Sequence, residues 1–121
     1  MTSTTDTIDT YLAAYNEPEA DARRELVGQA FADDGALIDP PIDGTGHDGI
    51  SDMMGAVHQQ YPGHRFKRAS AVDEHHGYFR YGWELRGPDD AVVLEGTDVG
   101  MVDEAGRLAR VIGFFGPLAA E

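Results

Sequence analysis

The spacing of hydrophobic side chains changes from three or four residues to two at about residue 63 of this chain. The longer spacing is that of amphipathic helices. It predicts one helix over residues 8–15, a second that Pro18 opens and that reaches Phe31, and a third over residues 50–61. Between the second and third helices, residues 36–39 are predicted to be extended and residues 43–49 to form a loop rich in glycine and aspartate.

Beyond residue 63, hydrophobic and polar residues alternate as in strands with one buried face. The alternation predicts strands over residues 64–72, 76–86, 91–102 and 107–116, joined by polar turns at residues 73–77, 87–90 and 103–106. Helices followed by consecutive hairpins indicate an α+β fold in which helices cover one face of an antiparallel sheet. The 121 residues, 1–121, suit a single domain with one core.

Asp98 is a charged residue within one of the most strand-like segments, residues 92–102. On strand alternation it shares a face with Val92 and Leu94, and its nearest neighbours on that face are Gly96 and Gly100. Glycine inside a strand often marks a place that another group approaches closely. A carboxyl on an apolar face predicts a pocket with an acid in its wall, and burial without a lysine or arginine partner would keep that acid protonated at neutral pH.

The composition is acidic and lacks cysteine. A formal net charge of −13 repels nucleic acid and anionic membranes, so neither is an expected partner. The absence of cysteine excludes disulfides and thiol catalysis, and it fits a reducing cytoplasm. The N-terminus does not resemble a signal peptide, and no apolar run reaches the roughly 20 residues of a membrane helix. The expected location is therefore the cytoplasm.

The five histidines predict no metal site. His75 and His76 lie in a predicted polar turn, where a solvated side chain is the usual outcome. His58 lies near the apolar stripe of the third helix, and two roles are open for it: a core histidine with a satisfied ring, or a residue of the pocket. Phosphate-binding loops, nucleophile elbows and zinc helices are also absent from the sequence.

Three polar residues are candidates for chemistry. Tyr11 lies on the buried face of the first helix, Asp39 is held extended because it precedes Pro40, and Asp98 lies in the strand. Each has a structural explanation when taken singly. Together they offer a phenol donor, an ionised carboxylate and a neutral acid, and two carboxyls in different environments can act as base and donor.

Two N-terminal stretches carry a family resemblance, Tyr-Leu-Ala-Ala-Tyr-Asn at residues 11–16 and Phe-Ala-Asp-Asp-Gly-Ala-Leu-Ile-Asp-Pro at residues 31–40. Downstream segments add to it at residues 46–50, 97–98, 106–108 and 114–116. Together they resemble ketosteroid isomerases, within the wider superfamily of SnoaL-like and NTF2-like domains. The resemblance implies a cone, in which three N-terminal helices pack on a curved antiparallel sheet.

By position, the resemblance also implies roles for the three candidates. Tyr11 would match the oxyanion-hole tyrosine of the isomerases, Asp39 their general base, and Asp98 their protonated oxyanion-hole acid, a known case of pKa tuning. The implied chemistry is removal of a proton next to a ketone, stabilisation of the enolate by two hydrogen bonds, and return of the proton to another carbon. It uses no metal and no organic cofactor.

A steroid is not the expected ligand, because several polar or bulky side chains among the other lining residues would narrow the pocket. The residues expected to bind a small hydrophobic ligand are Tyr15, Phe31, Met54, His58, Trp83 and Phe114. A SnoaL-type polyketide cyclase and a non-catalytic ligand-binding domain are the alternatives. The limonene-epoxide hydrolases of the same fold carry an Arg-x-Asp pair, and Gly96 stands where that arginine would be.

The outer face of the sheet is expected to be too apolar for water. This predicts a homodimer through that face, which would carry Val93, Val99, Met101, Val111 and Phe115.

Overall fold

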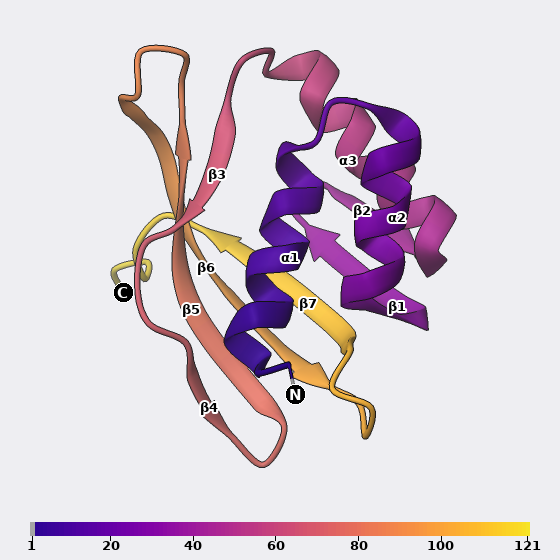
Figure 1. The fold of residues 1–121 in the computed structure, drawn as a ribbon. Helices are drawn as coiled ribbons and strands as arrows, with labels where there is room; N and C mark the ends of the chain where they lie inside the picture. The colour runs from indigo at the N-terminus through magenta and orange to yellow at the C-terminus, as the bar shows by residue number, and fades with distance from the viewer. Residues whose placement is uncertain (1) are drawn as a thin grey trace.

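Three helices lie against one face of a curved seven-stranded sheet in the computed structural model, which describes residues 2–121 (Figure 1). The elements follow in the order α1 (Thr4–Asn16), α2 (Ala20–Ala30), β1 (Phe31–Asp39), β2 (Ile42–Thr45), α3 (Gly46–Gln60), β3 (Arg65–Arg68), β4 (Asp73–His75), β5 (Tyr78–Arg86), β6 (Val92–Val102) and β7 (Leu108–Phe115). The strand order is β2-β1-β7-β6-β5-β3, and β4 also pairs with β5. The mixed α+β class is as predicted.

The sheet is mixed, which corrects the prediction of an antiparallel one. β1 pairs in parallel with β7, with Leu37 opposite Val111, while the other strand pairs are antiparallel. The helices are also not all N-terminal, since the β1–β2 hairpin separates α3 from α1 and α2. Alternation within a strand identifies its buried face but not its partner, so this crossover was not predictable from local pattern.

β1 begins at Phe31, directly after α2, and includes Asp33-Asp34-Gly35, whereas the extended segment was predicted only over residues 36–39. The pairing with β7 shifts register between Phe31 and Ala36, so the turn-like residues form an irregularity inside the strand. Residues 73–75, predicted as part of a turn, form β4 instead. The actual turn is His76-Gly77, where both residues have positive φ values of 53° and 79°.

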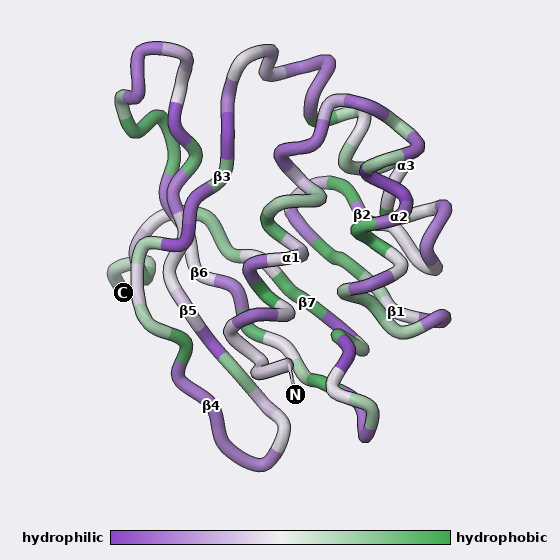
Figure 2. Tube along the Cα trace, viewed as in Figure 1, coloured by the Kyte–Doolittle hydropathy of each residue, from purple (hydrophilic) through white to green (hydrophobic). Residues whose placement is uncertain are grey.

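The buried face of α1 agrees with the predicted spacing, and Ser3 caps the helix in a reciprocal arrangement with Asp6. The core fills the space between the helices and the inner face of the sheet; its fully buried large side chains include Ile8, Tyr11, Phe31, Leu37, Ile50, Met54 and Leu108. Figure 2 shows the contrast along the chain, with hydrophobic stretches in β1 and β7 and a polar loop after β4. No helix within residues 2–121 has the length and apolar character needed to cross a bilayer.

Candidate functional site

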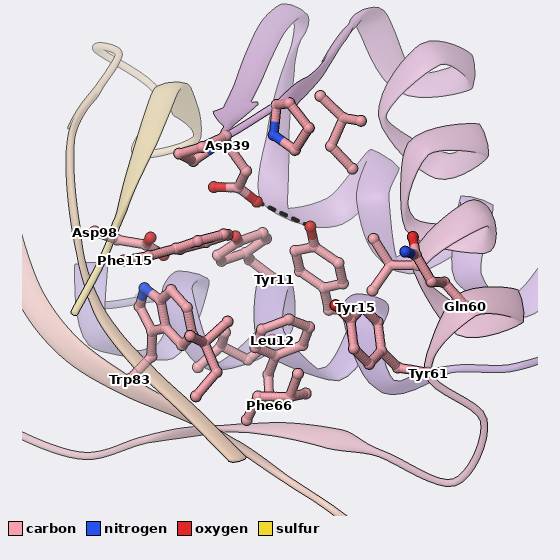
Figure 3. Close-up of a pocket in the computed structure, with 16 residues that line it drawn as sticks. Tyr11, Leu12, Tyr15, Asp39, Gln60, Tyr61, Phe66, Trp83, Asp98 and Phe115 are labelled. Carbon is pink, nitrogen blue, oxygen red and sulfur yellow. Dashed lines mark hydrogen bonds between the residues drawn. The ribbon is translucent and has the colours of Figure 1, made fainter. Parts of the chain in front are cut away.

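A cavity of about 210 Å³ opens between α1, the end of β1 and the inner face of the sheet (Figure 3). Aromatic and aliphatic side chains form most of its wall, and two carboxyl groups enter it. The lining residues are Tyr11, Leu12, Tyr15, Asp39, Pro40, Pro41, Ile42, Val57, Gln60, Tyr61, Phe66, Trp83, Leu85, Leu94, Asp98 and Phe115. No lysine, arginine or histidine is among them.

Asp98 lies in the middle of β6 and is only 2% exposed. Its Oδ2 accepts a hydrogen bond of 2.5 Å from the Tyr81 hydroxyl, and within residues 2–121 no basic side chain forms an ion pair with it. Burial raises the pKa of Asp98 from 3.8 to about 7, the Tyr81 hydrogen bond opposes this rise, and the nearby Asp39 charge adds to it. Asp98 therefore releases its proton near neutral pH and not in the acidic range of an exposed aspartate.

Burial of Asp98 was expected from Val92, Leu94 and neighbouring aromatic residues, and the aromatic part of that prediction holds, whereas Val92 does not contribute. Val92 is 41% exposed, whereas Tyr81 and Trp83 are 3% and 4% exposed and Tyr11 is 2% exposed. The carboxyl of Asp98 lies near the Trp83 indole in Figure 3. The acid is buried as predicted, mainly by rings from β5 and α1, and Leu94 of its own strand lines the same cavity.

The glycines beside Asp98 accommodate those rings. A Cβ on Gly96 would lie 2.3 Å from Cζ2 of Trp83, and a Cβ on Gly100 would lie 2.6 Å from Cζ of Phe79. Both glycines therefore mark close approach, as predicted, and each is approached by an aromatic ring of β5 and by a carbonyl oxygen of β7, that of Phe114 at Gly96 and that of Arg110 at Gly100. Gly96 in particular allows Trp83 to lie across β6 and enter the cavity wall.

Asp39, at the end of β1, is half-buried and points into the cavity (Figure 3). The Tyr15 hydroxyl donates a hydrogen bond of 2.9 Å to its Oδ2. Burial raises the pKa of Asp39, and the hydrogen bond from Tyr15 partly offsets the rise. A carboxylate with a raised pKa is a stronger base than an ordinary exposed one, so the site suits proton abstraction.

Gly113 of β7 brings the two carboxyls together. It is the register partner of Asp98, and the parallel pairing of Ile38 with Ile112 brings Asp39 beside it. A Cβ on Gly113 would lie 2.1 Å from Oδ1 of Asp39 and 3.1 Å from Oδ1 of Asp98. The carboxyls converge over this bare piece of backbone, so the parallel β1–β7 pair creates the site.

Three buried phenols surround the carboxyls. Burial is the largest cause that raises the pKa of Tyr11, Tyr15 and Tyr81 well above 10.0, and the Asp98 or Asp39 charge adds to it. All three hydroxyls therefore stay protonated at neutral pH and can donate hydrogen bonds. Tyr15 supports Asp39 and Tyr81 supports Asp98, while Tyr11 packs edge-on against Phe31 with ring centroids 5.5 Å apart.

Tyr81 was missed from the sequence, although a signal for it was present. It lies directly opposite Asp98 in the β5–β6 hairpin. Counting outward from the turn at residues 87–90 would place Tyr81 opposite Gly96, and a register shift between Leu85 and Arg86 moves it to Asp98. The available signal was strand alternation, which places Tyr81 on the same face of β5 as Trp83, a predicted pocket residue.

The cavity contains five of the predicted site residues: Tyr11, Tyr15, Asp39, Trp83 and Asp98. Phe31 and Met54 are in the core but do not line it. His58 of α3 does not line the cavity but lies in a small hollow that adjoins it through shared wall residues such as Tyr15 and Phe66, and its Nε2 is buried without a hydrogen-bond partner among the described residues. Residues 2–121 contain no cluster of three or more potential metal ligands.

Phe114 is the remaining correction, because it lies on the other face of the sheet and is 56% exposed. Gly113 faces the same side as Asp98, so Phe115 and Val111 share that side and Phe114 does not. Phe115 lines the cavity, and Val111 is fully buried. The prediction that these two residues lie on the outer face was wrong by one strand position.

The sequence matches no protein-family model and no curated protein. Among solved structures, it is 41% identical to a protein from Agrobacterium tumefaciens str. C58, described as a candidate isomerase of the SnoaL-like family. That match has a TM-score of 0.89 and covers 97% of this chain and all, 100%, of the other.

Two more distant structures share the fold. One is a protein from Catenulispora acidiphila DSM 44928 with a ketosteroid isomerase-like fold, in complex with trimethylamine; its identity is 12% and its TM-score 0.74, over 92% of this chain and 85% of that one. The other is a candidate polyketide cyclase from Sinorhizobium meliloti, with 18% identity and a TM-score of 0.70, over 90% of this chain and 94% of that one.

Proposed function

This chain belongs to the SnoaL-like family, and from that premise we propose that it is an enzyme that enolises a small, hydrophobic carbonyl compound without a cofactor. One observation carries the proposal: Asp39 and Asp98 converge over Gly113 in an aromatic cavity that has no basic residue in its lining. The two carboxyls differ in burial and hydrogen bonding, which is the arrangement that separates a base from an acid.

Asp39 acts as the base in this proposal. Its carboxylate accepts a proton from the carbon next to the carbonyl, and the electron pair of that bond moves toward the carbonyl oxygen. Tyr15 holds the carboxylate in place through its hydrogen bond. The same carboxyl then returns the proton to another carbon, so that atoms and charge balance over the cycle.

Asp98 and Tyr11 stabilise the charge that develops on the oxygen. Neutral Asp98 donates one hydrogen bond and the Tyr11 hydroxyl donates another, and buried donors of this kind are the strongest contributors to such reactions. Tyr81 positions Asp98 from the adjacent strand. The rings of Trp83 and Phe66 supply the apolar wall for the body of the substrate.

The size of the cavity limits the substrate. A dry cavity of about 150 Å³ holds one benzene molecule. The 210 Å³ available here suits one ring with short substituents, and it is too small to enclose a four-ring steroid. A monocyclic ketone with acidic protons next to the carbonyl is the proposed substrate class.

The experiment uses cyclohex-3-en-1-one in deuterated water. We expect deuterium to replace the protons next to the carbonyl and the double bond to move into conjugation, which NMR and ultraviolet absorbance follow separately. Asp39→Asn should reduce both rates by roughly 10²–10⁴-fold, because a positioned base contributes about that much, while the ketone affinity changes only a few-fold. Tyr11→Phe should have a smaller effect, since Asp98 still supports the oxygen.

A non-catalytic ligand-binding domain is the competing proposal, and the same experiment separates the two. Binding of ketones by the wild type with no exchange above the buffer rate, across a series of one-ring and two-ring ketones, favours the binder. Full activity of Asp39→Asn would overturn the assignment of the base. Unfolding of Asp39→Asn, seen by circular dichroism, would make Asp39 structural.

A further inference from the structure

The aromatic rings of the cavity stand at steep angles to one another. Phe66 and Trp83 have centroids 5.5 Å apart with planes at 72°, and Trp83 and Phe115 are 5.7 Å apart at 84°. On the other side, Tyr11 and Tyr15 are 5.7 Å apart at 60°. These rings, from α1, β3, β5 and β7, line different sides of the one cavity and form an aromatic box around it.

The charge in this box is entirely negative. Asp39 and Asp98 are the ionisable carboxyls of the lining, and no basic side chain balances them. The negative face of an aromatic ring attracts a cation placed within about 6 Å of its centroid, most strongly when water is excluded. Carboxylates and ring faces therefore favour the same kind of ligand.

We propose that the cavity binds a small organic ammonium ion, whose charge lies beside Asp39 and Asp98 and whose methyl groups pack against the rings of Trp83 and Phe66. This goes beyond the proposed enolisation and does not rest on it, because a cavity that enolises nothing can still bind a cation. The net charge of −13 adds a favourable field for an approaching cation.

The protonation of Asp98 makes this binding depend on pH. Its pKa is about 7, so an adjacent cation favours the ionised form and a proton is released on binding near neutral pH. The other titratable groups that face Asp98 are Tyr11 and Tyr15 from α1, Asp39 from β1 and Tyr81 from β5. β7 presents Gly113 and Phe115, neither of which titrates. The phenols stay neutral over this range, so the change of affinity belongs to the two carboxyls.

Choline and 3,3-dimethylbutan-1-ol form the test pair. They have the same shape, but choline has a positively charged nitrogen where the alcohol has a neutral carbon. Calorimetry measures both affinities, and the fluorescence of Trp83, the single tryptophan of the chain, reports binding inside the cavity. We expect choline to bind at least about ten-fold more tightly at pH 8, as expected for a desolvated cation–π contact. The preference should shrink at pH 6, where Asp98 is mostly neutral.

Three variants locate the binding. Asp98→Asn and Asp39→Asn should each reduce the preference for choline. Trp83→Leu should lower the affinity for choline more than the affinity for 3,3-dimethylbutan-1-ol. Asp52→Asn is the matched control, since Asp52 is an exposed residue of α3 and its loss changes the net charge equally. Equal affinity of the two compounds for the wild type, or a choline preference that Asp52→Asn reduces as much as the pocket variants do, would overturn the proposal.

Two further outcomes separate this inference from the proposed function. Choline binding without ketone exchange would support the cation site and contradict only the proposed enzyme function. Ketone exchange that choline does not inhibit would overturn the cation site, since both ligands are placed in one cavity. Because the wild-type comparison needs no variant, a variant that fails to fold does not remove the test.

Discussion

At the scale of single residues, the environment of Asp98 decides its chemistry. The same side chain on the strand surface would be ionised at neutral pH, whereas three rings and a neighbouring carboxylate bring its pKa to about 7. The hydrogen bond from Tyr81 limits that rise because it stabilises the ionised form. The pKa of Asp98 therefore depends on the hydrogen bond from the Tyr81 hydroxyl.

Tyr81→Phe is expected to raise the pKa of Asp98 above 7, because it removes the strongest hydrogen bond to the carboxylate while leaving the ring in place. A carbon-13 NMR titration of the carboxyl measures this directly. Tyr78→Phe, an exposed position of the same strand, is the control and should leave the titration unchanged. A lower pKa in Tyr81→Phe would show that Tyr81 does not stabilise the charged form.

The buried acid also predicts how stability depends on pH. The folded chain holds the Asp98 proton up to about pH 7, whereas the unfolded chain releases it near 3.8, so this group lowers the free energy of unfolding as pH rises through that window. At about 1.4 kcal/mol per pH unit, the loss amounts to about 4 kcal/mol above pH 7.

Asp98→Asn should remove this dependence, because the amide does not ionise and its oxygen can still accept from Tyr81. Urea unfolding at pH 5 and pH 8 gives the two free energies for each protein. We expect the variant to gain stability relative to the wild type as pH rises between these values. A constant difference between the two proteins would contradict a buried, titrating Asp98.

At the scale of secondary-structure elements, the parallel contact of β1 with β7 makes the site possible. It places the end of β1 beside Gly113, where Asp39 meets Asp98 from the opposite side. The contact also explains why a glycine stands at this position: a methyl group would occupy the space of the Asp39 carboxylate. The parallel strand pair brings the two carboxyls together, and the absence of a side chain at Gly113 leaves room for them.

Gly113→Ala is expected to lower stability by about 1–3 kcal/mol, the usual cost of forcing extra volume into a packed site. It should also displace Asp39 and reduce ketone exchange. Gly82→Ala is the matched control, since its Cβ would meet no atom closer than 3.6 Å, and its effect should be neutral or stabilising by up to about 1 kcal/mol. Thermal unfolding and the exchange assay measure both variants.

Gly113→Ala would contradict this account of the site if it kept both its stability and its exchange rate. The carboxyls would then have room to separate without loss, and their close approach over Gly113 would have no function.

At the scale of the whole molecule, the helices cover one face of the sheet and leave apolar side chains on the other. Val93, Met101 and Phe114 are 53%, 37% and 56% exposed. Phe114 lies on this outer face, whereas Val111 and Phe115, which were predicted to lie there, face the helices. The protein also carries a net charge of −13, so two copies repel one another at low salt.

We predict a homodimer through this outer face. Sedimentation equilibrium at micromolar concentration should show twice the chain mass of 13.1 kDa, with tighter association as salt screens the repulsion. Met101→Glu should shift the protein toward the monomer. Ala56→Glu, which adds the same charge on an exposed position of α3, is the control. A single 13.1 kDa species for the wild type would rule the dimer out.

The sequence by itself determined the features that depend on neighbours along the chain. The three-or-four-residue spacing predicted α1, and the alternation beyond residue 63 predicted β5, β6 and β7 to within a few residues. It also identified Asp98 as a buried acid, since a carboxyl on an apolar strand face between two glycines is visible locally. Tyr11, Tyr15, Asp39 and Trp83 were placed in the pocket through the family resemblance and local pattern.

Only the tertiary structure decided which distant residues meet. The parallel β1–β7 pair, the convergence of Asp39 and Asp98 over Gly113, and the exchange of Phe115 for Phe114 all depend on the register between strands, and one residue of register moves every side chain to the other face. Neither the spacing of hydrophobic residues nor the composition contains that register. It follows from the packing of all the strands and helices at once, so the folded chain alone determined the geometry of the site.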